Sequence, residues 1–297
     1  MHPIGSPRLA LTATIATIAV LLALSGCQFG DSDPPPPGDD AATLVITADH
    51  GDVLLLEEPI SPGRSVLRSL RDTAAIETSY GGEFVAKIFD RSSDRDGRRD
   101  WFFFVDGVLS PVGARQRPVG AGQHVWWDHR PWQAVRDPWA TVGAWPAPFA
   151  DRPVVADPPL DTILSAAGAE VVADSPWRVL VGADRELRER DDAWRRAAAD
   201  PSAAGMTAYI RGAEVFALPR DGGEHQPVPR GAAVAVAVPT GLDQQAGVVL
   251  AVAGITAEAA TRAAARIADE PMVLQDRYAV VFDAAGAPLL AAGQGEL

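Results

Sequence analysis

Two short segments concentrate aromatic side chains in a pattern that suits the binding of a flat ligand. One reads Trp-Phe-Phe-Phe-Val-Asp-Gly over residues 101–107, and the other reads His-Val-Trp-Trp-Asp-His over residues 124–129. Alternate side chains of a strand point to opposite faces, so each segment predicts an aromatic row on both faces of a sheet. Large aromatic residues dominate binding energy where such a row is open. The candidate ligand-binding residues are therefore Trp101, Phe103, Trp126, Trp127 and Trp132.

The same aromatic rows have a second interpretation, in which they are packed inside the protein. A single sheet with one helix across it buries only one face fully, so the other face needs a cover. Residues 133–157 follow at once and contain Trp139, Trp145 and Phe149 among many prolines. Aromatic side chains of this kind pack readily against a sheet. We favour this interpretation and expect the connector or the region after it to supply the cover.

Residues 92–100 half-match a calcium-binding loop. Asp94, Asp96 and Asp100 place oxygen atoms around a glycine, which is the arrangement that calcium prefers. The position of the bidentate acid is occupied by Phe103, however, and four arginines lie between residues 91 and 99. We therefore expect a solvated hairpin loop, and these three aspartates are weak candidates for a metal site.

Residues that could bind zinc or carry out catalysis are sparse. His124 and Asp128 would lie about 13 Å apart along one strand, and His129 points to the opposite face, so a shared zinc site is not expected. The sequence has no Gly-x-Ser-x-Gly motif, no His-Glu-x-x-His motif and no phosphate-binding loop. Asp184 and Thr256 stand where helices are expected to begin, and we interpret them as helix caps. No cofactor is assigned, and we expect that the protein is not an enzyme.

The elements that must position the aromatic rows are read from periodicity in residues 43–132. Val66, Leu67, Leu70 and Ala74 share one face at helical spacing. The order strand, strand, helix, strand, strand, strand suits a small mixed sheet with one helix across it, as in β-grasp folds. The expected strands are residues 44–49, 53–58, 84–90, 101–107 and 123–129.

Five short motifs lie along the same region. They are Gly-Arg-Ser-Val-Leu at 63–67, Gly-Glu-Phe-Val at 82–85, the Trp-led strand at 101–107, Gly-Ala at 113–114 and Val-Gly-Ala-Gly-Gln-His-Val-Trp-Trp at 119–127. Together they resemble a bacterial domain family of unknown function, related to the C-terminal cap domain of transcobalamin and intrinsic factor. Asp106 stands where that pattern has Asn, and Gln123 where it has Asp. The resemblance implies a β-grasp-like fold and makes cobalamin or another corrinoid a candidate ligand.

Residues 158–297 predict an α/β domain that follows the β-grasp-like one, so the fold class expected for the chain is α+β. Two stretches, 177–218 and 248–286, each run from a valine-rich strand through an Ala- and Arg-rich helix to a second strand. This alternation is typical of βαβ units with parallel pairing. The similarity indicates either an internal repeat or a shared composition without duplication.

A different chemistry is expected at Cys27, the only cysteine of the 297 residues. Arg8 precedes an apolar run over residues 9–24, which is typical of a secretory signal and shorter than the roughly 20 residues of a membrane span. The run ends in Leu-Ser-Gly-Cys, which resembles the bacterial lipobox. The resemblance implies that residues 1–26 are removed and that Cys27 carries lipid. Residues 27–42 are then an acidic, proline-rich linker.

The net charge of the chain and its expected localisation indicate which partners it could have. The net charge of −13 argues against nucleic acid as a partner, because phosphate binding needs clustered Lys and Arg. We expect a lipoprotein on the extracytoplasmic face of the cell membrane that binds a cofactor-like solute without catalysis, as an accessory to uptake. A transporter or another envelope protein would be its partner. The alternative is a structural or protein-interaction lipoprotein of the cell envelope with no small-molecule ligand.

Overall fold

The computed structural model describes residues 38, 40–94, 96–135, 137–219, 221–241 and 246–289. Cys27, the expected signal peptide and most of the expected linker lie outside these ranges, so the expectations placed on them stay predictions. In the described ranges, no helix is long and apolar enough to cross a membrane. Helices and strands both contribute to the cores, and the fold class is α+β, as the sequence predicts.

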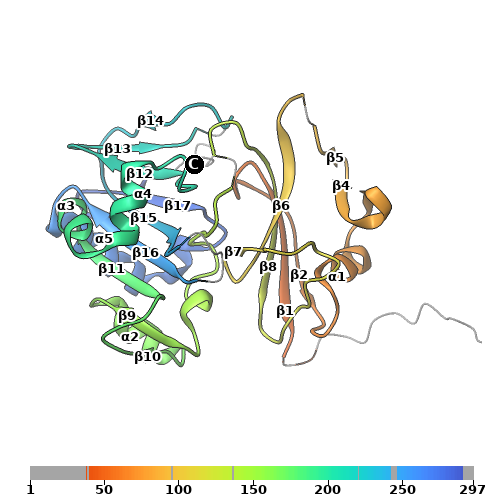
Figure 1. Ribbon diagram of the computed structural model, residues 1–297, viewed down its shortest axis with the longest axis horizontal. Coiled ribbons are helices and arrows are strands. Elements are labelled where there is room, and N and C mark those ends of the chain that lie inside the picture. Colours follow the sequence, from red (N-terminus) through yellow and green to blue (C-terminus); the bar gives the residue numbers. More distant parts are fainter. Residues whose placement is uncertain are drawn as a thin grey trace, which may run out of the picture. The chain divides into compact units, whose positions relative to one another are not determined.

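Alternating apolar residues build a five-stranded sheet from the first region (Figure 1). The strands follow the order β2-β1-β8-β6-β7. β1 runs parallel to β8, whereas β1 with β2 and β8 with β6 are antiparallel pairs. The β-grasp name for this sheet stays a prediction. Its strands are β1 (Ala42–Ala48), β2 (Val53–Ile60), β6 (Arg99–Val105), β7 (Val108–Leu109) and β8 (His124–Pro131).

One helix, α1 (Val66–Thr73), packs on one face of this sheet. Ser65 caps it by accepting a hydrogen bond from the backbone N–H of Arg68 at 3.3 Å. The buried side chains of Val66, Leu67 and Leu70 meet the inward row of the sheet, as their spacing predicts. A short antiparallel sheet extends this layer: β3 (Ile76–Ser79), the 3-10 turn η1 (Tyr80–Gly82), β4 (Phe84–Ile88) and β5 (Arg91–Ser92).

The second region forms a seven-stranded mixed sheet, with the order β10-β9-β11-β16-β15-β17-β18. The first four strands of this order, from β10 to β16, run parallel to their neighbours. β15 lies between β16 and β17 and is antiparallel to both. The strands are β9 (Pro153–Ala156), β10 (Glu170–Val171), β11 (Arg178–Ala183), β15 (Gly231–Pro239), β16 (Val248–Gly254), β17 (Ala279–Asp283) and β18 (Pro288–Leu289).

Two apolar cores lie on the two faces of this second sheet. On one face, α2 (Leu160–Ala166) and α5 (Ala257–Asp269) pack over the strands, together with Phe149. On the other face lie α3 (Asp184–Arg190), α4 (Asp192–Ala199) and a small sheet. That sheet contains β12 (Ala208–Arg211), β13 (Glu214–Ala217) and β14 (Gln226–Pro227). The 3-10 turns η2 (Ala147–Phe149) and η3 (Pro271–Leu274) complete the elements.

The two similar stretches of the second region fold differently. β11 and β16, the first strands of the two stretches, pair in parallel with each other. The strand after the first helix, β12, does not join the main sheet, however, and pairs antiparallel with β13 instead. The parallel unit expected over 177–218 is therefore wrong. After the helix breaks at Asp191, the chain continues over the outer face, where the β12–β13 hairpin covers apolar side chains of β15 and β17. In the second stretch, β17 does join the main sheet.

Candidate functional site

The aromatic row that faces away from α1 is buried by the second region. Trp126 and Phe104 are both 0% exposed. The ring of Tyr278 lies 4.9 Å from the ring of Trp126 and 5.5 Å from that of Phe104. The indole N–H of Trp126 donates to the hydroxyl of Thr47 at 2.7 Å. The interpretation favoured from the sequence is thus the correct one for this face, and Trp126 is a core residue rather than part of an open surface.

Buried polar groups accompany this aromatic contact. Asp128, which is 0% exposed, accepts hydrogen bonds from the hydroxyls of Thr47 at 2.7 Å and Tyr278 at 3.0 Å. Arg130 is also 0% exposed, and its guanidinium lies 3.8 Å from the ring centre of Phe102. Burial raises the pKa of Asp128, while these hydrogen bonds and Arg130 lower it in part. The contacts that Asp128 and Arg130 make with Tyr278 connect the first sheet to the second region, whereas the bonds of Thr47 stay within the first sheet.

His50 belongs to the same junction. It sits in the turn between β1 and β2, where Asp49, His50 and Gly51 all have positive φ. Its ring lies 5.4 Å from that of Tyr278, and neither ring nitrogen has a hydrogen-bond partner among the described residues. Burial, together with the positive charges of Arg130 and Arg99, holds the pKa of His50 well below its usual value. The imidazole is therefore neutral in the folded protein.

The histidines and the aspartate considered for zinc do not converge. His124 lies 3.0 Å from Asp276, and a ring nitrogen of His129 lies 3.1 Å from the carbonyl oxygen of Ser92. Asp128 instead points into the buried junction described above. In the part of the chain that the structure describes, no group of three or more His, Cys, Asp or Glu side chains could hold a metal ion.

The aspartates of the 92–100 loop stabilise turns. One carboxylate oxygen of Asp94 accepts the backbone N–H groups of Asp96 and Gly97 at 3.0 and 2.9 Å. Asp100 accepts the hydroxyl of Ser93 at 2.6 Å and the backbone N–H of Trp101 at 2.9 Å. Their oxygens thus serve the loop itself, which agrees with the hairpin interpretation.

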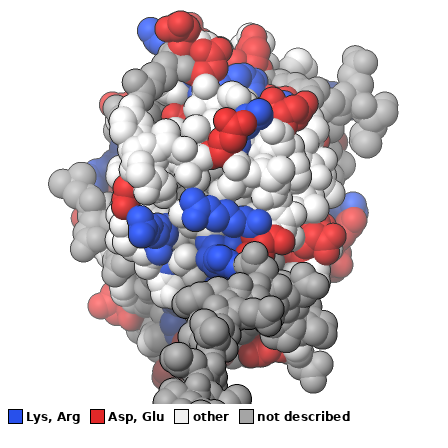
Figure 2. All heavy atoms as spheres, turned by 90° about the vertical axis from the view of Figure 1, so that its right-hand side faces the viewer, with Lys and Arg blue, Asp and Glu red and all other residues white. Residues whose placement is uncertain are grey.

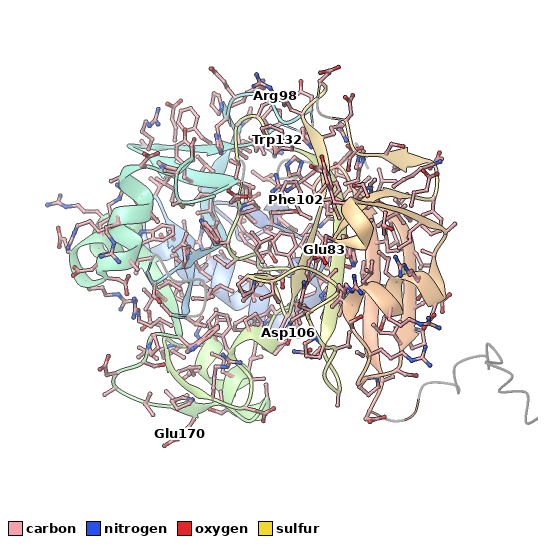
Figure 3. All side chains as sticks on the ribbon, turned by 45° about the vertical axis from the view of Figure 1, so that its right-hand side comes forward. Glu83, Arg98, Phe102, Asp106, Trp132 and Glu170 are labelled. Carbon is pink, nitrogen blue, oxygen red and sulfur yellow. The ribbon has the colours of Figure 1, made fainter. Side chains whose placement is uncertain are left out.

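An open pocket of about 340 Å³ lies on the α1 side of the first sheet, between β4 and β6. Three of the five candidate ligand-binding residues line it: Trp101, Phe103 and Trp127. Phe103 and Trp127 stack with their ring centres 4.8 Å apart. Trp132 lies outside it, beyond the end of β8, where its backbone N–H donates to the carbonyl of Arg98 at 3.0 Å (Figure 3).

The splaying of two strands explains why this pocket exists. β5 pairs with β4, and Asp94 pairs with Arg99 at the start of β6, so β4 and β6 are tied together at one end. At the other end, β7 pairs only with Phe104 and Val105. Among the described residues, the strand pairing along this edge therefore stops at Phe104, and beyond it the backbone N–H of Ser110 donates to the carbonyl of Phe103 at 3.4 Å. Glu83 and Phe102, both labelled in Figure 3, are two of the residues that line the pocket.

One wall of the pocket could not be foreseen from the sequence. Residues 109–114 cross its mouth and contribute Val112, which is 44% exposed. Phe84 of β4 lines the opposite side. The only local signal was the Pro- and Gly-containing composition of 111–113, which indicates a loop but not its contacts.

Trp127 forms part of the pocket wall and is 3% exposed. Its indole nitrogen is buried and has no hydrogen-bond partner among the described residues, so the pocket contacts the ring of Trp127 and not its N–H group. At this position the wall therefore offers an aromatic surface, which suits a flat apolar group, rather than a hydrogen-bond donor.

Comparisons with known proteins place the pocket in one domain. A model of a domain of unknown function, DUF4430, matches residues 63–130, and this range contains every residue of the pocket wall. No protein with a curated description matches the chain significantly. Among solved structures, the chain is similar to a "putative metal binding protein" from Ruminococcus gnavus ATCC 29149. Sequence identity is 14%, the match covers 31% of this chain and 96% of the other, and the TM-score is 0.25.

Proposed function

We propose that residues 43–132 form a binding module whose ligand inserts a flat apolar group into the pocket between β4 and β6. The observation that carries the proposal is the pocket itself, with the stacked rings of Phe103 and Trp127 in its wall. Ligand sites are typically apolar clefts with a few polar groups that fix orientation. Figure 2 shows the right-hand side of Figure 1, where residues other than Lys, Arg, Asp and Glu cover much of the surface beside a group of basic side chains.

The size of the pocket sets the ligand class. Small-molecule sites span roughly 300–1,000 Å³, so a volume of about 340 Å³ suits one or two fused rings. A whole corrin macrocycle is larger than this, and a corrinoid would place only a peripheral group inside. The transcobalamin-like resemblance keeps corrinoids as the cofactor-like candidates, and the volume favours smaller aromatic solutes.

A neutral fluorescent probe, N-phenyl-1-naphthylamine, tests the pocket. We expect saturable binding to the full chain with enhanced emission. Phe84→Gln should weaken binding about tenfold, because it removes apolar contact area from the wall. Leu54→Gln is the matched control, since Leu54 is 57% exposed and lies outside the pocket. Equal affinity of the wild type and Phe84→Gln, or no binding at all, would refute the proposal.

Cyanocobalamin tests the corrinoid version separately. Titration calorimetry with the full chain should give a binding signal that Phe84→Gln weakens if a corrinoid is the ligand. Binding of the neutral probe without binding of cyanocobalamin would retain the pocket and remove corrinoids from its ligands.

At the level of the whole chain, the proposal is a lipid-anchored extracytoplasmic binding protein that assists the uptake of its ligand without catalysis. It is supported by the signal-like residues 1–26 and by the lipobox-like sequence before Cys27. Radiolabelled palmitate should be incorporated into the wild type in bacterial cells, and Cys27→Ser should abolish both the label and membrane association. Unchanged labelling of the variant would disprove the anchor.

A second function is favoured by the uncovered edge of β6. An extended peptide could pair with residues 101–102 and place alternate apolar side chains in the pocket. The chain would then be a protein-interaction lipoprotein. Selection from a displayed peptide library should enrich alternating apolar sequences that bind the wild type and fail to bind Phe84→Gln. Enrichment without such a pattern would count against this alternative.

A further inference from the structure

A second pocket, of about 460 Å³, shares residues 109–112 of its wall with the first. Its wall combines Arg117, Asp106 and Gln123 of the first region with Arg152 and Trp177. We propose that this pocket binds an organic anion, whose carboxylate or phosphate group meets the two arginines and whose flat body rests on the apolar wall. This site goes beyond the proposed function, because it needs residues from both regions.

Arg152 is the principal cation of the site. Its guanidinium stacks over the ring of Trp177, with 4.0 Å from Cζ to the ring centre, and its Nε donates to the carbonyl of Ala150 at 3.4 Å. Among the described residues, no carboxylate lies within ion-pair distance of it. Stacking fixes the plane of the guanidinium and leaves its remaining N–H donors for a ligand, which is the geometry that suits carboxylate and phosphate groups.

Burial supports the same assignment. The surroundings of Arg152 lower the pKa of its guanidinium, and the negative charges of Asp106 and Asp151 oppose this shift only in part. A partly desolvated cation gains more from an anionic ligand than an exposed one does. The positive charge of Arg152 is thus only partly compensated by the acids near it.

Arg117 provides a second cation. Its side chain makes no hydrogen bond or ion pair with any residue in the described ranges, although its backbone is fixed by a hydrogen bond from the N–H of Val66 at 2.8 Å. Most other arginines in the described ranges are paired with acids, as Arg188 is with Asp184 at 2.8 Å. Two arginines without acidic partners therefore line one pocket.

Asp106, the acid in the pocket wall, is already satisfied. One carboxylate oxygen accepts the backbone N–H of His124 at 2.9 Å, and the other accepts the side-chain amide of Gln123 at 2.8 Å. Two arginines against one hydrogen-bonded carboxylate leave a positive balance in the wall. Trp177, Pro148 and Val108 supply the apolar surface for the body of the ligand.

A pair of matched probes tests the proposal on the full chain. 2-Naphthoate and its neutral amide, 2-naphthamide, have the same ring system and differ mainly in charge. We expect 2-naphthoate to bind at least about tenfold more tightly, because charge-assisted hydrogen bonds are stronger than neutral ones. Arg152→Met retains an apolar stem over Trp177 and should remove this preference.

Controls make the result decisive. Arg117→Met should reduce the preference severalfold without affecting the fold, since its side chain has no internal partner. Arg185→Met should leave it unchanged, because the side chain of Arg185 is 90% exposed and lies outside this pocket. Binding of N-phenyl-1-naphthylamine should persist in all three variants, which separates this site from the first pocket. Equal affinity for the two naphthalene probes, failure of both to bind, or a preference that survives in Arg152→Met and Arg117→Met would overturn the proposal.

Discussion

Acidification should destabilise this protein through His50. The side chain is 2% exposed, and both ring nitrogens lack hydrogen-bond partners among the described residues. Its surroundings include Tyr278, whose ring lies 5.4 Å away, and the positive charges of Arg130 and Arg99. Protonation would bury an uncompensated positive charge beside two others, so the folded state resists it. Asparagine is the informative replacement because it tolerates the positive φ of 65° at this position and does not titrate.

The sign and size of the effect follow from linkage. The pKa of His50 in the folded protein lies well below its usual value, with burial as the largest cause. The stabilisation is therefore complete above the unfolded pKa of about 6.5 and is lost as the pH falls below it toward the folded pKa. The loss is about 1.4 kcal/mol per pH unit, or about 2 kcal/mol between pH 7 and pH 5.

Other groups contribute to the same window. Burial also lowers the pKa of His129 and of His225, which adds to the loss on acidification. The raised pKa of Asp128 acts in the opposite direction, because its contribution declines as the pH rises from the unfolded pKa through the folded one. The comparison between wild type and variant isolates His50 from these groups.

Urea denaturation at pH 7, 6 and 5 provides the measurement. The free energy of unfolding of the wild type should fall with pH more steeply than that of His50→Asn, and the difference should reach about 2 kcal/mol at pH 5 relative to pH 7. His225→Asn should change the slope less, because His225 is only partly buried and contacts the carbonyl oxygen of Met206 at 2.9 Å. Parallel pH profiles for the wild type and His50→Asn would show that the histidine reaches solvent or a proton acceptor.

Three further changes test the junction and the hairpin by urea denaturation. Tyr278→Phe should cost about 1–3 kcal/mol, because Asp128 loses a buried donor at 3.0 Å; an unchanged stability would mean that another donor replaces it. Gly51→Ala should cost about 2–4 kcal/mol, since φ is +89° and a Cβ would lie 2.0 Å from a backbone oxygen of the second region; a smaller loss would indicate a looser contact. Asp106→Asn and Gln123→Glu should each destabilise, and the double variant should recover about 1–2 kcal/mol by restoring one acid and one amide; additive losses would contradict the direct bond between them.

The first region could be predicted from sequence because its signals are local. The alternation at 101–107 places Trp101, Phe103 and Val105 on one face, and these three side chains lie together in the core under α1. Val66, Leu67 and Leu70 are buried as their helical spacing requires. Side-chain periods depend only on the backbone geometry of one element, so no knowledge of distant segments was needed.

The residues that bury the face of the first sheet opposite α1 could not be identified from local periodicity. Tyr278 lies 150 residues after Asp128, and no periodicity in either segment indicates that they meet. The aromatic residues that follow the first region were the nearer candidates, yet Phe149 and Trp145 pack into the core of the seven-stranded sheet. Strand β9 lies in the same stretch. It has only four residues, so no alternating pattern is evident among the prolines at 146, 148 and 153. Which distant segments pack together depends on the total apolar area that the whole chain can bury, and local sequence patterns do not contain that information.

The bond between Asp106 and Gln123 links the sequence pattern to the second pocket. These are the two positions at which the chain departs from the pattern it resembles, with Asp for Asn and Gln for Asp. The structure joins them by a hydrogen bond of 2.8 Å, so the acid and the amide have exchanged places and the pair remains complementary. The backbone N–H of His124 also donates to Asp106, in the turn that follows β6. The exchange thus places in the pocket wall a carboxylate whose two oxygens are hydrogen-bonded, and its negative charge offsets part of the cost of burying the guanidinium of Arg152.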